Sequence, residues 1–139
     1  MAGLKPRELH KHLVDPNIAA PVAMTVWAFS NTATADATIQ GPKVTRKVRL
    51  VRASYQQTSD ATAVTSYTLQ LMNGAVALTS ALDIKAIAAT AGADFVVTAV
   101  ADADILADGD VITAVFNETG GTVTAPDQVA IALELQLLS

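Results

Sequence analysis

The segment Tyr-Thr-Leu-Gln-Leu-Met-Asn-Gly-Ala-Val-Ala-Leu, residues 67–78, decides the fold class of this chain. In its first half Leu69 and Leu71 alternate with polar neighbours, which is the period-2 pattern of a half-buried strand. Asn73-Gly74 follows, and an Asn-Gly pair between two apolar runs is typical of a β-hairpin closed by a type I′ turn. The segment therefore predicts two antiparallel strands joined by a tight turn.

Strand patterns also occur on both sides of this hairpin. Alternating apolar residues predict a strand at 22–30, continued by 38–40, before Gly41-Pro42 turns the chain. A strand at 44–56 changes the parity of its apolar residues near Leu50, as a β-bulge would cause. Further strands are predicted at 95–99, 111–117 and 129–137.

The strand at 129–137 shows the clearest alternation, with large apolar residues on one side, and we expect it to be central in its sheet. Residues 83–91 fit either a helix or a strand. Roughly seven or eight short strands with turns about every ten residues predict an all-β fold, an antiparallel β-sandwich of jelly-roll or immunoglobulin-like type.

The composition fits one domain with a core of Val, Leu and Ile. The chain has 139 residues and is 51% hydrophobic, yet it holds only one Trp, two Tyr and three Phe. There is no Cys, so disulfides and thiolate chemistry are excluded, and assembly in the cytosol is favoured. We expect no export signal, and no apolar run reaches the about 20 residues that a membrane span requires.

Residues 1–21 differ in character from the rest of the chain. Leu9 and Leu13, four apart, predict one or two helical turns that end at Asp15-Pro16. A helix this short is not stable alone. We therefore expect 1–21 to be an N-terminal arm, either extended or a short helix, with a disordered terminus as the alternative, and 22–139 to be the sandwich domain.

Charge is divided unequally along the chain. The net charge is −4, but residues 1–52 carry a net +5 and residues 53–139 a net −9. A chain of this kind can dock onto copies of itself or onto an acidic scaffold, while the alternative is ordinary solvated charge. Nucleic-acid binding requires a basic groove interleaved with aromatic residues, and only Tyr55 lies near the basic run, so we expect none.

The residues available for catalysis are few. The chain has two His, His10 and His12, both in the arm, and it lacks a Gly-x-Ser-x-Gly motif and a phosphate-binding glycine loop. We therefore predict that the protein is not an enzyme and uses no cofactor. Four clustered acidic residues are candidate calcium ligands, although their spacing is not that of an EF-hand and a solvated turn is the alternative. They are Asp102, Asp104, Asp108 and Asp110.

Two predicted strands, 95–100 and 111–116, carry apolar residues on both faces. A single sandwich buries only one face of each sheet, so the second apolar set needs another cover. We expect a neighbouring subunit to supply it, and the alternative is the arm or a loop of the same chain.

Four segments together resemble small virion proteins of tailed bacteriophages. They are the strand at 43–55, the Leu-rich strand at 67–71 before Asn-Gly, the turn at 105–112 and the closing strand at 129–137. In that family a strand, a Thr/Asp loop, a Leu-rich strand and a Leu-x-x-Gly-Asp-Val/Leu turn recur in this order. The resemblance covers roughly residues 22–138 and lies in pattern and composition.

This resemblance implies a capsid decoration (cement) protein, often trimeric, that binds the outside of the major capsid lattice and stabilises it. The implied partners are the major capsid protein and further copies of this chain. The implied location is the capsid surface of a virion assembled in the host cytoplasm. The family has no catalytic residues to transfer.

From the arm and the basic run we predict which residues make these contacts, because an arm that orders on binding can clasp an acidic surface. The candidates are Lys5, Arg7, Leu9, Lys11, Leu13, Arg46, Arg49 and Arg52. The alternative function is a receptor- or carbohydrate-binding fibre or tail module. For that function Trp27 and Tyr55 are the only candidate aromatic residues, and we expect both to serve core or interface packing instead.

Overall fold

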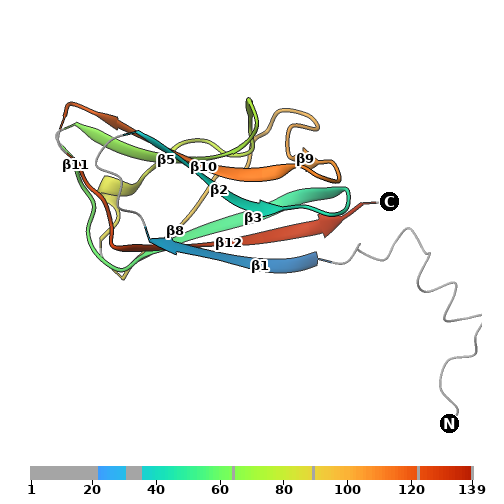
Figure 1. Cartoon of the computed structure of the whole chain (residues 1–139), viewed down its shortest axis with the longest axis horizontal. Coiled ribbons are helices and arrows are strands. Elements are labelled where there is room, and N and C mark those ends of the chain that lie inside the picture. Colours follow the sequence, from blue (N-terminus) through green and yellow to red (C-terminus); the bar gives the residue numbers. More distant parts are fainter. Residues whose placement is uncertain (1–21, 31–35, 64, 89, 122, 139) are drawn as a thin grey trace, which may run out of the picture.

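The protein is a sandwich of two antiparallel sheets. The computed structural model describes residues 22–30, 36–63, 65–88, 90–121 and 123–138. In Figure 1, β1 and β12 belong to the lower layer and β5 and β10 to the upper one. The all-β sandwich predicted from the sequence is confirmed. The predicted arm, 1–21, lies outside the described residues.

The first sheet has the strand order β1, β12, β3, β8, and β9 also pairs with β3. Its strands are β1 (Val22–Ser30), β12 (Gln128–Leu137), β3 (Val48–Gln57), β8 (Gly92–Asp94) and β9 (Ile105–Leu106). As predicted, the last strand is central, because β12 pairs with β1 on one side and β3 on the other. Within the described part of the chain β1 pairs with β12 alone and forms one edge of the sheet.

The second sheet has the strand order β2, β10, β5, β6, and β7 also pairs with β5. Its strands are β2 (Ala37–Lys43), β10 (Val111–Thr119), β5 (Ser66–Asn73), β6 (Val76–Ala77) and β7 (Leu82–Asp83). A separate short pair is formed by β4 (Thr62–Ala63) and β11 (Val123–Thr124). Residues 83–91, ambiguous in the sequence, contain the 3₁₀ turn η1 (Ile84–Ala86), with Asp83 as its N-cap.

The predicted hairpin is confirmed, but its turn is of a different type. Asn73 pairs with Val76, so the two loop residues are Gly74 and Ala75. Gly74 has φ +58°, and neither Asn73 nor Ala75 has a positive φ. A positive φ at the first loop position alone fits type II′ and not type I′. The physical reason is that Asn73 ends the strand, where its side-chain amide donates to Asp110 Oδ2 at 2.8 Å.

The turn predicted at Gly41-Pro42 is wrong, because β2 continues through both residues to Lys43. β2 is an edge strand, so the missing N–H of Pro42 can face away from the sheet without loss of a hydrogen bond. The register against β10 shifts between Val111 and Thr113, which accommodates the irregularity. The glycine is required for a separate reason, since a Cβ at Gly41 would lie 2.7 Å from ring carbons of Trp27 on β1.

The strand predicted at 95–99 is also wrong. The Phe95 N–H donates to Ala53 in the first sheet, and the Thr98 N–H donates to Leu78, which follows the second sheet's β6. This segment therefore crosses between the sheets and closes one side of the sandwich, and only Val97 forms an isolated bridge. The predicted bulge, in contrast, is confirmed, because the register of β3 against β12 shifts beside Val51.

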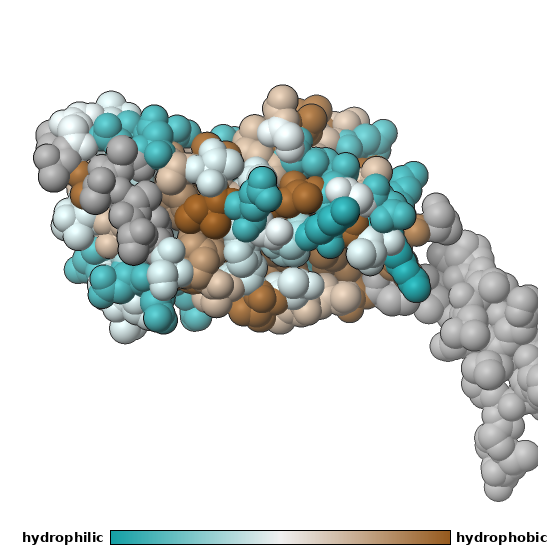
Figure 2. Space-filling model, viewed as in Figure 1, coloured by the Kyte–Doolittle hydropathy of each residue, from teal (hydrophilic) through white to brown (hydrophobic). Residues whose placement is uncertain are grey.

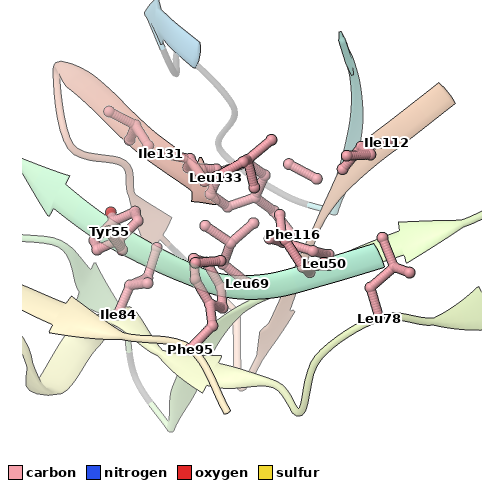
Figure 3. Close-up of a cluster of buried hydrophobic side chains, with 14 of the residues drawn as sticks. Leu50, Tyr55, Leu69, Leu78, Ile84, Phe95, Ile112, Phe116, Ile131 and Leu133 are labelled. Carbon is pink, nitrogen blue, oxygen red and sulfur yellow. The ribbon is translucent and has the colours of Figure 1, made fainter. Parts of the chain in front are cut away.

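The core lies between the two sheets and is built mainly from aliphatic side chains around a few rings. Figure 3 shows side chains from both sheets pointing toward one another, among them Leu50, Leu69, Phe116 and Leu133, none of them more than 1% exposed. The Tyr67 and Phe116 rings are 5.7 Å apart. The sandwich thus has a complete core of its own, as expected of a single domain.

Candidate assembly surfaces

The basic residues of β3 are paired with acidic residues of the same chain. Arg52 donates from its guanidinium to Asp94 at 3.1 Å. Arg49 Nε lies 3.3 Å from Asp104 Oδ2, close enough for an ion pair but not aligned for a hydrogen bond. Opposite charges that are distant in the sequence therefore meet within the fold, which leaves less charge available to a partner.

Of the other predicted contact residues, Arg46 is exposed and makes no ion pair with any residue that the structure describes. It lies with exposed Lys47 in the loop between β2 and β3, next to exposed Lys43, the last residue of β2. We call these three residues the basic loop. The predicted arm contacts lie outside the described residues; they are Lys5, Arg7, Leu9, Lys11 and Leu13.

The acidic segment around Asp104 forms turns. Asp110 Oδ2 accepts from the Ala107 N–H at 2.9 Å and from the Asn73 amide at 2.8 Å. Asp102 has φ +62°, a conformation that Asp tolerates in turns. Among the described residues no three His, Cys, Asp or Glu side chains converge as a metal site would require. The Asp104 and Asp110 carboxylates instead bond to groups of the same chain and stabilise the fold.

Two polar side chains, those of Tyr55 and Gln57, are buried beside each other in the core. The fully buried Tyr55 hydroxyl donates to Gln57 Oε1 at 2.8 Å, and Gln57 Nε2 donates to the Ile87 carbonyl at 2.6 Å. Burial raises the pKa of Tyr55 far above its usual range, and Tyr67 raises it further. Tyr55 is therefore a core residue and not a ligand-binding aromatic residue. His10 and His12 lie outside the described residues.

Two hollows open near the two ends of β1. One of about 560 Å³ is lined by Phe29, Gln57, Thr90 and others, and the Gln57 amide is already bonded inside the protein. The other, of about 450 Å³, is mainly apolar and is lined in part by Val22 and Leu135. The one aromatic ring that lines them, Phe29 in the first hollow, is half-buried, whereas glycan sites typically present an exposed ring.

Among the residues that the structure describes, β1 carries the largest group of exposed apolar side chains. Val22, Met24 and Val26 point away from the core and are 52%, 64% and 65% exposed. We call these three residues the β1 stripe. On β12 the residue opposite Val26 is Ala132, which is too small to cover it. Figure 2 shows hydrophobic residues along the lower edge of the molecule, where Figure 1 places β1.

Two further exposed valines lie on the segment that follows β8 and crosses between the sheets. Val96 and Val100 are each 68% exposed, whereas Phe95 between the sheets is buried. We call Val96 and Val100 the valine pair. The sequence correctly placed apolar residues on both sides of this segment, although it is not a strand.

The other segment predicted to be apolar on both faces, 111–116, presents no such patch. Its inner residues, such as Phe116, are buried. On the outer side Val115 is half-buried and lies between Thr38 of β2 and Gln70 of β5. Polar neighbours therefore interrupt its outer face.

The sequence pattern did not predict the β1 stripe. Residues 22–30 are apolar on both parities, and the alternation alone does not say which parity faces the core. The inner set contains Trp27 and Phe29, whose rings are 5.0 Å apart and pack against the core. The larger rings therefore take the inner face and leave the aliphatic stripe outside.

The part of the chain that the structure describes has no helix long and apolar enough to cross a membrane. Comparison of the chain with protein-family models, with curated proteins and with solved structures finds no match. The resemblance to virion proteins therefore rests on the sequence pattern alone.

Proposed function

We propose that this protein is a structural subunit that joins neighbouring proteins, and specifically a capsid decoration protein that binds the outside of a major capsid lattice. The observation that carries the proposal is the presence of two sets of exposed apolar residues, the β1 stripe on an edge strand of the first sheet and the valine pair on the segment that crosses between the sheets after β8. A subunit that cements an assembly must contact at least two neighbours. Two separate apolar surfaces supply two such contacts.

These surfaces are not an incomplete core. The interior between the sheets is already filled, with Tyr67, Leu69 and Ile131 fully buried. Exposed Val and Met side chains on a domain with a complete core are therefore available to partners, and their burial would be favourable by about 25 cal/mol for each Å² removed from water.

Charge supports the same role. The basic loop is exposed at one end of the sandwich, where it can meet an acidic capsid surface. The arm, which carries further basic and leucine residues, is proposed from the sequence to extend this contact. Removal of residues 2–14 should then weaken particle binding, and unchanged binding would argue against the arm's part in it.

The test uses capsids that lack this protein, incubated with the purified chain and sedimented. We expect saturable binding by the unchanged protein and a large loss when Val96→Asp and Val100→Asp are combined. Val76→Asp is the matched control, because Val76 is also an exposed valine, at 46%, but belongs to neither surface.

The alternative function gives a different result. A receptor- or carbohydrate-binding module would bind on a glycan array and would not saturate sites on bare capsids. Absence of saturable capsid binding, at concentrations where the protein is folded, would contradict the decoration role.

A further inference from the structure

The sheet edges in the described part of the chain differ in how they are protected against pairing with another chain. β8 has three residues and β6 has two, and both are too short to pair extensively. β2 carries Gly41, Pro42 and Lys43 and a register shift. Short strands, Pro, Lys and irregular register are the features with which natural sheets block their edges.

β1 has none of these features. It contains nine residues without a charge, a Pro or a Gly, and its register against β12 is regular from Val22 to Ser30. Among the described residues, its backbone makes no hydrogen bond besides that ladder. Alternate N–H and C=O groups therefore point away from β12, ready to bond an added strand.

We propose that β1 pairs antiparallel with β1 of a second copy of this chain, about a two-fold axis at Val26, so that the two first sheets become one. This inference names a partner for the assembly role proposed above and rests on that role. It replaces the trimer that the virion resemblance implies with a two-fold dimer.

Side-chain size selects this register. Val26 is the fifth of the nine residues, so an axis there pairs the strand over its whole length. Each large side chain then lies opposite a small one of the other copy, which lets the strands approach evenly. The resulting pairs are Ala23 with Phe29, Met24 with Ala28, and Thr25 with Trp27.

The pairing also gives the β1 stripe a neighbour. Met24 and Val26 are about two-thirds exposed, and Ala132 on the β12 side leaves Val26 uncovered. In the dimer Val26 lies beside its own counterpart, and no charged group is brought near another, because β1 has none.

The first experiment is sedimentation equilibrium of the purified chain without capsids. We expect a mass of twice 14.4 kDa. Val26→Lys places two like charges opposite each other at the axis and should weaken the dimer by at least about tenfold. Val76→Lys, a charge on an exposed valine outside β1, should leave the dimer intact. Emission of the single Trp and far-UV circular dichroism verify that each variant is folded.

The second experiment tests the register with cysteine, since the natural chain has none. V26C should cross-link to its counterpart on mild oxidation, because facing residues of antiparallel strands are about 4.5–5.5 Å apart between Cα atoms, within disulfide range. M24C lies opposite Ala28 of the other copy and should cross-link far more slowly.

A monomer or a trimer at all concentrations tested would overturn the proposal, and so would a dimer in which M24C cross-links faster than V26C. These results are separate from those for the proposed function. Self-association is measured without particles. A monomer that still binds capsids saturably would therefore contradict the proposed dimer without contradicting the proposed decoration role.

Discussion

The contact between Gly41 and Trp27 gives the sharpest prediction for stability. An alanine Cβ at position 41 would lie 2.7 Å from two ring carbons of Trp27, about 0.7 Å closer than the 3.4 Å at which ordinary contact begins. Overpacking of this kind costs about 1–3 kcal/mol. Ala also restricts the unfolded chain more than Gly does, and this offsets about 0.4–1 kcal/mol of the overpacking cost. Gly41→Ala should therefore destabilise the fold by about 1–2 kcal/mol net.

The assay is urea denaturation followed by both far-UV circular dichroism and fluorescence. Trp27 is the only Trp of the chain, so its emission reports this one contact. If the added methyl pushes the half-buried ring outward, the emission of folded Gly41→Ala shifts to longer wavelength and the urea midpoint falls.

A double-mutant cycle separates the ring contact from backbone effects. Trp27→Leu removes the ring atoms that approach position 41, so Gly41→Ala in that background should be neutral or slightly stabilising. The reasoning is refuted if Gly41→Ala costs the same with Leu at position 27, or if it changes neither stability nor emission with Trp27 in place.

Three further predictions concern polar groups. Tyr55→Phe removes the donor to Gln57 and should cost about 1–2 kcal/mol at neutral pH. Because the pKa of Tyr55 is raised in the folded state, the stabilisation of the fold by its hydroxyl is fully present below about pH 10. Above that pH this stabilisation declines by about 1.4 kcal/mol per pH unit, so the urea midpoints of the two proteins should converge between about pH 8 and 11. Asp110→Ala strips two hydrogen bonds and should cost about 1–3 kcal/mol in urea denaturation, whereas Asp108→Ala, an exposed control, should change stability by less than about 0.5 kcal/mol. Asp94→Asn breaks an ion pair whose side chains are 59% and 57% exposed, and thermal denaturation should show an effect below about 0.5 kcal/mol that vanishes in high salt.

The strands that could be predicted from the sequence are those whose alternation is set by burial of one face. β5 and β12 place Leu69, Leu71 and Leu133 toward the core, and both were expected at nearly their observed positions. The bulge beside Val51 could be predicted for the same reason, because an inserted residue moves every later side chain of the strand to the other face.

The wrong predictions concern segments whose conformation depends on contacts with residues distant in the sequence. Pro42 signals a turn in the local sequence, but it is compatible with a strand at an edge, and only the strand order shows that β2 is one. Residues 95–98 have the composition of a strand, yet their backbone bonds go to two different sheets. The turn type was missed because the partner of Asn73 is Asp110, distant in the sequence.

The candidate surfaces were predictable only in part. Exposed apolar residues near Val96 followed from their presence on both parities, whereas the β1 stripe required knowing that Trp27 faces inward over Gly41. The pairing of Arg49 with Asp104 depends on β9 lying beside β3, which no local pattern encodes.

The central place of β12 sets the order in which the protein can fold during synthesis. Among the described strands β1 pairs only with β12, so Val22 cannot form its ladder bonds before its partner Gln136 has been synthesised. At about 5–20 residues per second, the roughly one hundred residues between the two strands take the ribosome about 5–20 s to add. Throughout that interval an uncharged apolar strand is unpaired on both sides. Slowing elongation between these strands should therefore lower the yield of soluble protein more than the same delay placed before β1.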